Sequence, residues 1–161
     1  MSLNDDKIAE LEQVKNLIFQ MANLKNQLQE LGIIKNSDNV LSGYAEWFCS
    51  VKFGLELCNK NEIGYDALST FEKRILIKSK VGSDINFEID FEIRLDNFDY
   101  LFIVFIDENT WMIDSVYSVS FDIVTKFLNT DLGKKFEWRR ESRSLSLQLY
   151  PSEENTLEPV F

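Results

Sequence analysis

The sequence predicts an α/β protein that begins with an amphipathic helix. Apolar residues recur at spacings of three and four across residues 8–31, which is the period of a helix with one apolar face. Residues 85–95 alternate between apolar and polar, as in a strand with one buried face. Residues 101–106 are all apolar, as expected of a central strand covered on both faces.

A length of 161 residues fits one globular domain with an appendage. We expect an amphipathic helix over residues 1–32, a globular domain over residues 33–150 and a C-terminal tail over residues 151–161. The tail follows the last predicted element, and such chain ends are usually held loosely.

The N-terminal helix carries a long and nearly heptad apolar stripe. Asn4, Asp5 or Asp6 can cap its start, and Gly32 is a natural stop. The stripe consists of Ile8, Leu11, Val14, Ile18, Met21, Leu24, Leu28 and Leu31. Two interpretations stay open, a helix packed on its own domain and a coiled coil. The length of the stripe favours a partner, and we expect a homo-oligomer that assembles through this helix.

The next predicted element is a helix through residues 44–52. Ser37 or Asp38 can cap it, and Gly54 lies near its end. The remaining elements are predicted as strands at 55–57, 65–68, 75–77, 85–95, 101–106 and 111–116, a helix at 120–128 and a last strand at 144–149. The strands at 65–68 and 75–77 are separated by a short turn, so we expect them to pair.

Composition and charge exclude several kinds of chemistry. The chain has no histidine, which removes histidine-based triads, histidine-bound zinc and imidazole acid–base catalysis. The net charge of −10 opposes nucleic-acid binding by the molecule as a whole, because that affinity depends on neutralising phosphates. A local basic groove remains compatible with this charge.

The N-terminus and the two cysteines indicate a cytoplasmic protein. The first residues have neither the basic nor the apolar region of a secretory signal. If one helix runs through both Cys49 and Cys58, they lie on different faces, too far apart for a disulfide, and both are expected to be buried. The apolar run at 101–106 is far shorter than the roughly 20 residues of a membrane span, so we expect no membrane partner.

One combination of residues points to phosphodiester chemistry. Asp66 stands at the start of one predicted strand, and Lys78 at the end of its neighbour. Metal-dependent cleavage needs a carboxylate to hold Mg²⁺, a second acid or amide, and a lysine near the attacking water. Taken alone, Asp66 is as easily a turn or capping residue and Lys78 a strand-end charge.

Five segments give this combination more weight: GYAEW at 43–47, GLEL at 54–57, GYDA at 64–67, RILIKSK at 74–80 and FDYL at 98–101. In order and spacing, from about residue 33 to residue 116, they resemble a family of uncharacterised prokaryotic proteins. Its members have the restriction-endonuclease-like fold and carry the PD-(D/E)XK nuclease signature or a variant with glutamine in the acid position. The resemblance implies a mixed sheet flanked by helices, action on DNA, and Mg²⁺ as cofactor.

Carried over to this sequence, the resemblance assigns Asp66 as a metal ligand and Lys78 as the active-site lysine. Glu46, on the preceding helix, matches an acid that assists the metal in some members of the wider fold. The sequence departs from the pattern at Leu76, where glutamate or glutamine is expected two residues before the lysine. Leucine cannot bind a cation, so activity depends on whether another group takes its place.

Three explanations of Leu76 stay open. Glu46 or Glu88 takes over the missing role, or the domain is a degenerate nuclease that only binds or scaffolds, or the alignment is shifted. Two functions follow from them. One is Mg²⁺-dependent hydrolysis of DNA, and the other is a non-catalytic interaction protein that keeps the nuclease scaffold.

Basic residues in two regions are candidates for contacts to nucleic acid. Lys80 follows the strand that carries Lys78, and Arg139 and Arg140 belong to a basic stretch at 134–143 that includes Phe136 and Trp138. Such a stretch can bind phosphates and stack on bases, although a solvated surface is favoured. The acids Glu88, Asp90 and Glu92 are likewise expected to form an exposed strand face.

Overall fold

The computed structural model describes residues 3–34, 39–58, 64–82, 86–91, 97–129 and 135–152. The chain divides into two compact units, Met1–Tyr44 and Ala45–Phe161. Ser37, Asp38, Ile85, Glu92 and the tail from residue 153 lie outside the described residues, so the predictions made for them are not addressed below.

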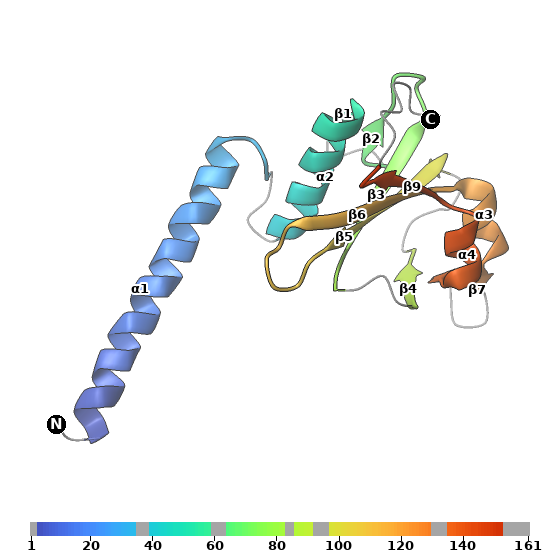
Figure 1. The fold of residues 1–161 in the computed structure, drawn as a ribbon. Coiled ribbons are helices and arrows are strands. Elements are labelled where there is room, and N and C mark those ends of the chain that lie inside the picture. The colour runs from blue at the N-terminus through green and yellow to red at the C-terminus, as the bar shows by residue number, and fades with distance from the viewer. Residues whose placement is uncertain are drawn as a thin grey trace. The chain divides into compact units, whose positions relative to one another are not determined.

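The first unit consists mainly of helix α1, Leu3–Glu30 (Figure 1). It ends as predicted at Gly32, whose φ of 72° is a conformation that glycine adopts at little cost. The amide of Ile33 donates to the carbonyl oxygen of Leu28 at 3.0 Å, which closes the last turn. Apolar side chains are exposed along most of α1, including Ile8, Ile18 and Leu24 of the predicted stripe.

Helix α2, Val40–Phe53, confirms the second predicted helix. Its start is capped by Asn39, whose Oδ1 accepts a hydrogen bond from the amide of Ser42 at 3.1 Å. Gly54, with a φ of 66°, follows its end. Gly43 lies close to Ile34, and a Cβ at residue 43 would be 2.8 Å from Ile34 Cγ2, which explains a glycine inside this helix.

The central sheet of the second unit is mixed, as predicted. Its strands are β1 (Glu56–Leu57), β2 (Ala67–Leu68), β3 (Arg74–Val81), β5 (Tyr100–Ile106), β6 (Ile113–Ser120) and β9 (Leu147–Tyr150). They lie in the order β1-β2-β3-β5-β6-β9. Only β3 and β5 pair in parallel, and the other neighbours are antiparallel. The antiparallel pairing of β2 with β3 confirms the expected strand pair.

A smaller antiparallel sheet accompanies the central one. Its strands are β4 (Phe87–Asp90), β8 (Lys135–Trp138) and β7 (Leu128–Asn129), in the order β4-β8-β7. Two short helices complete the unit, α3 (Phe121–Lys126) and α4 (Arg140–Ser144). Of the strand predicted at 85–95, the described part is β4, and of the basic stretch at 134–143 the described part forms β8 and α4.

The two faces of the central sheet meet different partners. Phe102 of β5 packs against Phe53 of α2 at a centroid distance of 5.8 Å. On the opposite face, Phe105 contacts Phe87 of β4 and Trp138 of β8, so this face is covered by the small sheet. Residues 101–106 are fully buried between these layers, which confirms the predicted central strand.

Several element boundaries differ from the predictions, and two of the differences have a clear cause. The strand expected at 111–116 begins at Ile113, because the carboxylate of Asp107 accepts hydrogen bonds from the amides of Asn109 and Thr110 and extends the turn. The helix expected at 120–128 ends at Lys126, since Leu128 pairs with Phe136 in the small sheet.

Candidate functional site

Asp66 is fixed beside strand β3 by main-chain and side-chain hydrogen bonds. Its amide donates to the carbonyl oxygen of Ile75 at 2.8 Å, and its own carbonyl oxygen accepts from the amide of Cys58 at 2.8 Å. Its Oδ2 accepts from the amide of Ile77 at 2.7 Å. The carboxylate therefore extends the pairing of β2 with β3 and lies next to the residue that precedes Lys78.

Leu76, in the position where the resemblance expects an acid, is a core residue. The register pairs Ala67 with Ile75, which places Asp66 opposite Leu76. The Leu76 side chain is only 5% exposed and belongs to the apolar cluster that includes Phe98 and Leu101. The predicted pairing of the two strands is present, but the position where the resemblance expects an acid holds the buried side chain of Leu76.

Lys78 lies on the same strand face as Leu76, further along β3. It is half-buried and lines a pocket of about 240 Å³ together with Lys80, Glu88 and other residues of β3, β4 and β5. The ammonium group of Lys135 lies 3.6 Å from a carboxylate oxygen of Glu88 and 3.6 Å from one of Asp90. The two carboxylates near Lys78 thus already share an ion-pair partner, a lysine of β8.

Glu46 belongs to a different surface of the sheet. It is half-buried on α2, the helix whose Phe53 packs on Phe102. Lys78 pairs with Ile103, the residue after Phe102 on β5. Because successive residues of a strand point to opposite faces, Lys78 points to the face of the sheet away from α2. Burial raises the pKa of the Cys49 thiol to about 12, and the negative charge of Glu46 adds to this. The structure does not bring Glu46 into the pocket that Lys78 lines.

These residues do not fit the magnesium site that the resemblance implies. A Mg²⁺ site needs oxygen ligands grouped around one point, and Leu76 supplies none. Asp66 directs Oδ2 to a main-chain amide. Glu46 lies on the helix that packs on one face of the sheet, and Lys78 points to the other face. Within the described ranges no group of three or more Asp, Glu, Cys or His side chains is arranged to hold a metal ion.

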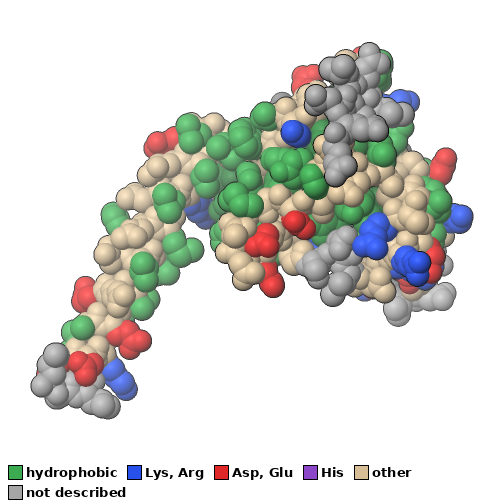
Figure 2. All heavy atoms as spheres, in the orientation of Figure 1, with side chains coloured by type: hydrophobic (Ala, Val, Ile, Leu, Met, Phe, Trp, Pro, Cys, Tyr) green, Lys and Arg blue, Asp and Glu red, His purple; other side chains and the backbone are tan. Residues whose placement is uncertain are grey.

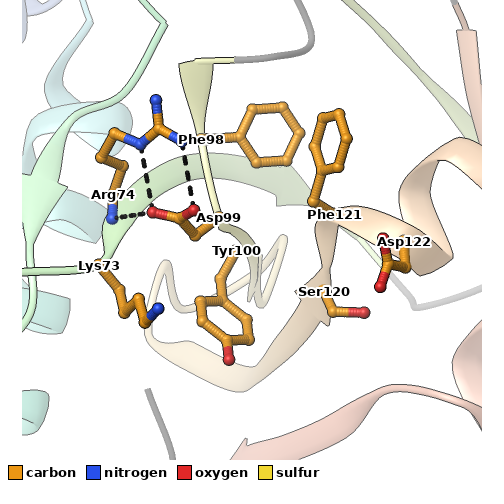
Figure 3. Close-up of a pocket in the computed structure, with 8 residues that line it drawn as sticks. All are labelled: Lys73, Arg74, Phe98, Asp99, Tyr100, Ser120, Phe121 and Asp122. Atoms are coloured by element: carbon orange, nitrogen blue, oxygen red, sulfur yellow. Dashed lines mark hydrogen bonds and ion pairs between the residues drawn. The ribbon is translucent and has the colours of Figure 1, made fainter. Parts of the chain in front are cut away.

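A second, larger pocket of about 370 Å³ lies where β3 and β5 begin and β6 ends (Figure 3). Arg74 and Asp99 form its polar wall. Asp99 Oδ2 accepts from the Arg74 amide at 2.8 Å and from Arg74 Nε at 3.2 Å, and Oδ1 accepts from Nη2 at 3.2 Å. The Arg74 side chain holds the pKa of the Asp99 carboxyl below its usual value. Arg74 of the RILIKSK segment and three of the four residues of the FDYL segment line this pocket, but the resemblance assigns a role to none of them.

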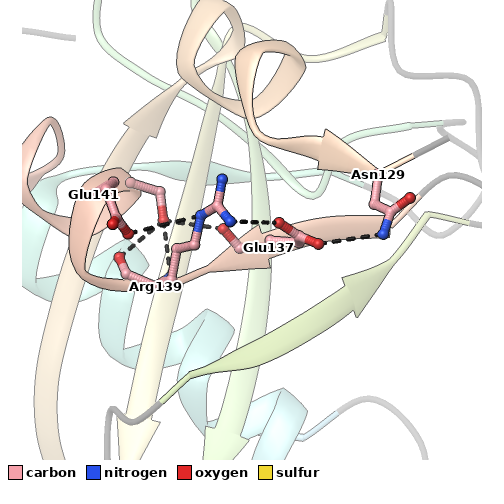
Figure 4. A network of polar contacts seen from close by, with 5 residues as sticks. Asn129, Glu137, Arg139 and Glu141 are labelled. Carbon is pink, nitrogen blue, oxygen red and sulfur yellow. Dashed lines mark hydrogen bonds and ion pairs between the residues drawn. The ribbon is translucent and has the colours of Figure 1, made fainter.

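The three residues predicted to contact nucleic acid lie on β3 (Lys80), at the residue before α4 (Arg139) and at the first residue of α4 (Arg140). Lys80 Nζ lies 5.5 Å from the centroid of the Phe87 ring. Arg139 forms ion pairs with Glu137 at 3.2 Å and with Glu141 at 3.7 Å, and Glu137 also accepts from Asn129 (Figure 4). Arg140 is exposed at the start of α4.

The aromatic residues of the basic stretch serve the core. Phe136 is fully buried and Trp138 is 1% exposed. Stacking on bases, the alternative considered for them, is therefore wrong for these rings, because they are packed between the two sheets. Cys49 is buried as expected, whereas Cys58 is only partly buried and lies beyond the end of α2, so no single helix carries both cysteines.

Comparison with protein-family models and with curated protein sequences gives no match for this chain. Among the described residues, no helix has the length and apolar character needed to cross a membrane.

Proposed function

We propose that this chain is a non-catalytic interaction protein that assembles through α1 and keeps the scaffold, without the chemistry, of a restriction-endonuclease-like domain. The observation that carries the proposal is the exposed apolar stripe of α1. The stripe runs nearly the whole length of a 28-residue helix that belongs to a compact unit of its own.

The side chains of the stripe favour binding over a purely structural role. Figure 2 shows apolar side chains spaced along α1, and those of Leu11, Ile18, Met21 and Leu24 are more than half exposed. Contiguous apolar surface of this kind usually marks a protein interaction site. Its near-heptad spacing is the pattern with which helices pair through knobs-into-holes packing.

The burial of Leu76 supports the non-catalytic part of the proposal. An acid at this position would place a charge inside the cluster formed with Phe98 and Leu101, which costs several kcal/mol unless a partner neutralises it. The apolar side chain instead contributes to the packing between the sheets. This position thus serves stability rather than metal binding.

The assembly is tested by comparing two variants of α1 with the natural chain. Ile18→Glu puts a charge in the middle of the stripe, and Asn16→Glu adds the same charge to the polar side two residues away. We expect Ile18→Glu to convert the oligomer to a monomer in multi-angle light scattering and Asn16→Glu to leave the mass unchanged. A natural chain that is monomeric at micromolar concentration would contradict the proposal.

Magnesium-dependent hydrolysis of DNA is the second candidate, favoured by the position of Asp66 beside β3 and close to Lys78 in sequence. It is tested by plasmid cleavage with Mg²⁺ or Mn²⁺, using the natural chain, Lys78→Ala and Leu76→Gln. The first proposal expects no cleavage by any of the three. Cleavage by the natural chain that Lys78→Ala abolishes would establish the hydrolase and overturn the non-catalytic assignment.

A further inference from the structure

We infer that the larger pocket, where β3 and β5 begin and β6 ends, binds a small zwitterion of the α-amino-acid class with an apolar side chain. Three features of the pocket carry this: a cation on one side, a carboxylate on the other, and an aromatic wall beside them. The volume of about 370 Å³ lies in the usual range of small-molecule sites. This binding is independent of assembly through α1.

Hydrogen bonds tie the main chain around the pocket into one row. The Asp99 amide donates to the carbonyl oxygen of Arg74 at 2.8 Å, and the Phe121 amide donates to the carbonyl oxygen of Asp99 at 3.0 Å. In the sheet, β5 lies between β3 and β6. Neighbouring strands are about 4.8 Å apart, so the chain entering β3 and the chain leaving β6 are separated by about 10 Å. Groups on these two segments therefore start from opposite sides of the pocket.

The cation of the pocket is Lys73, the residue before β3. Ser69 fixes its main chain, because the Ser69 amide donates to the Lys73 carbonyl oxygen at 2.9 Å and Ser69 Oγ accepts from the Lys73 amide at 3.1 Å. The nearby Asp99 is already paired with Arg74. Among the described residues, no carboxylate lies within ion-pair distance of the Lys73 ammonium group. This ammonium group can therefore pair with a carboxylate of a ligand.

The carboxylate of the pocket is Asp122, in the first turn of α3. Ser120 holds the start of this helix, since its Oγ accepts from the Ile123 amide at 3.4 Å. Figure 3 shows the side chains of Lys73 and Asp122 on opposite sides of Tyr100. Asp122 forms no ion pair with the lysine and arginine side chains that the structure describes. Its oxygens can therefore accept from an ammonium group of a ligand.

The aromatic wall consists of Phe98 and Phe121. Their rings pack edge to face with centroids 5.4 Å apart. Phe98 is only 3% exposed and also stacks on Phe91 at 5.8 Å, so it is held in place. Phe121 is half-buried and lines the pocket. An apolar side chain that packs against this wall is removed from water and contributes to affinity.

An α-amino acid has the three groups that this pocket accommodates. Its carboxylate, ammonium group and side chain are attached to one carbon, so a single compact molecule presents all of them. Lys73 would contact the carboxylate, Asp122 the ammonium group and Phe121 the side chain. The ion pair of Arg74 and Asp99 stays intact and forms the polar wall.

The charges of the lining oppose a polyanion at this pocket. Lys73 and Arg74 are balanced by Asp99 and Asp122. Nucleic-acid affinity depends on neutralising phosphates with an excess of cations, which this lining lacks. A molecule with one charge of each sign gains from both poles, whereas one with a single charge gains from only one of them.

Three probes of similar shape test the ligand class: L-phenylalanine, phenylpropanoate, which lacks the ammonium group, and phenylethylamine, which lacks the carboxylate. NMR titration of the isotope-labelled full chain measures their Kd values. We expect L-phenylalanine to bind with a Kd of about 1 mM or below and to shift the amide signals of Asp99 and Phe121. The other two probes should bind at least about fivefold more weakly, because each lacks one ion pair.

Two variants test the assignment of the poles. Lys73→Met should weaken binding of L-phenylalanine and phenylpropanoate about fivefold and leave phenylethylamine unchanged. Asp122→Asn should weaken L-phenylalanine and phenylethylamine to a similar extent and leave phenylpropanoate unchanged. Both residues are exposed, so the variants are expected to fold. Lys126→Met and Asp114→Asn, at exposed positions that do not line the pocket, are the matched controls.

Three results would overturn the inference. One is the absence of saturable binding of L-phenylalanine in the millimolar range. Another is equal binding of L-phenylalanine and phenylpropanoate, which would leave a simple anion site. The third is binding of L-phenylalanine that neither Lys73→Met nor Asp122→Asn weakens, which would place the ligand elsewhere.

Discussion

Leu76 and Asp66 lie opposite one another on adjacent strands, and each is held by a different kind of contact. Leu76 is packed into the apolar cluster between the sheets, and Asp66 accepts the amide hydrogen bond of Ile77. Both contacts stabilise the fold without requiring a ligand. The ion pair between Arg74 and Asp99, which line the larger pocket, likewise joins two parts of the fold without a ligand.

Replacing Leu76 by glutamate tests whether this position is structural. Leu76→Glu buries a carboxylate among apolar neighbours and is expected to lower the free energy of unfolding by about 3 kcal/mol or more. Leu76→Met keeps the volume and should cost less than about 1.5 kcal/mol. Urea denaturation followed by circular dichroism measures both values. Equal stability of Leu76→Glu and the natural chain would mean that the position is open to solvent.

The ion pair of Arg74 and Asp99 predicts a specific dependence of stability on pH. Because the pKa of Asp99 is lowered in the folded chain, its contribution is present above the ordinary carboxyl pKa of about 3.9. It is lost as the pH falls through the lower folded value. At pH 7, Asp99→Asn should cost about 1 kcal/mol, since the pair is partly exposed.

Urea titrations of the natural chain and Asp99→Asn between pH 7 and pH 3 check this dependence. The difference in unfolding free energy should stay constant down to about pH 4 and then shrink. Asp114→Asn, at an exposed position of β6, is the matched control and should change stability little at any pH. A difference that grows toward low pH would contradict the role of this pair.

Among the elements, those with a regular and long sequence pattern were predictable. Helix α1, the buried strand β5 and the pairing of β2 with β3 follow from apolar spacing and turns, which depend on local sequence. Helix α4 was missed because RESRS has no apolar period. Its start depends on Ser142, whose Oγ donates to the carbonyl oxygen of Glu137 and accepts from the amide of Arg139. Contacts of this kind are visible only after β8 is in place.

The candidate site was predictable to a smaller extent. The sequence placed Asp66 and Lys78 on neighbouring strands, and the pairing of β2 with β3 agrees with that arrangement. It could not reveal that the Asp66 carboxylate accepts from Ile77 or that Lys135 lies between Glu88 and Asp90. These depend on register and on the position of the small sheet, which no local pattern encodes.

The connection that leads into β2 depends on Gly64. Its φ is 94°, and a Cβ there would collide with the side chain of Asn97. Gly64→Ala should therefore lower the unfolding free energy by about 2 kcal/mol or more. Gly54 also has a positive φ but has open space around it, so Gly54→Ala should cost only about 1 kcal/mol. Thermal and urea denaturation of both variants would compare them, and equal losses would contradict the close approach of Asn97.

At the scale of the whole molecule, the chain combines a globular unit with a helix whose apolar face is exposed. The globular unit has a close-packed interior, with residues 101–106 of β5 fully buried between two layers. The helix exposes apolar side chains along its length, among them Ile18 and Leu24 at 60% each. A second copy of the chain would cover that surface, so we expect the protein to self-associate through α1.

The mass of the natural full chain in solution reports this self-association. Multi-angle light scattering at micromolar concentration should give about twice the chain mass of 18.8 kDa, falling toward the chain mass on dilution. The dilution series distinguishes a reversible dimer from aggregation. A mass of 18.8 kDa at every concentration would contradict assembly through α1, and with it the proposed function.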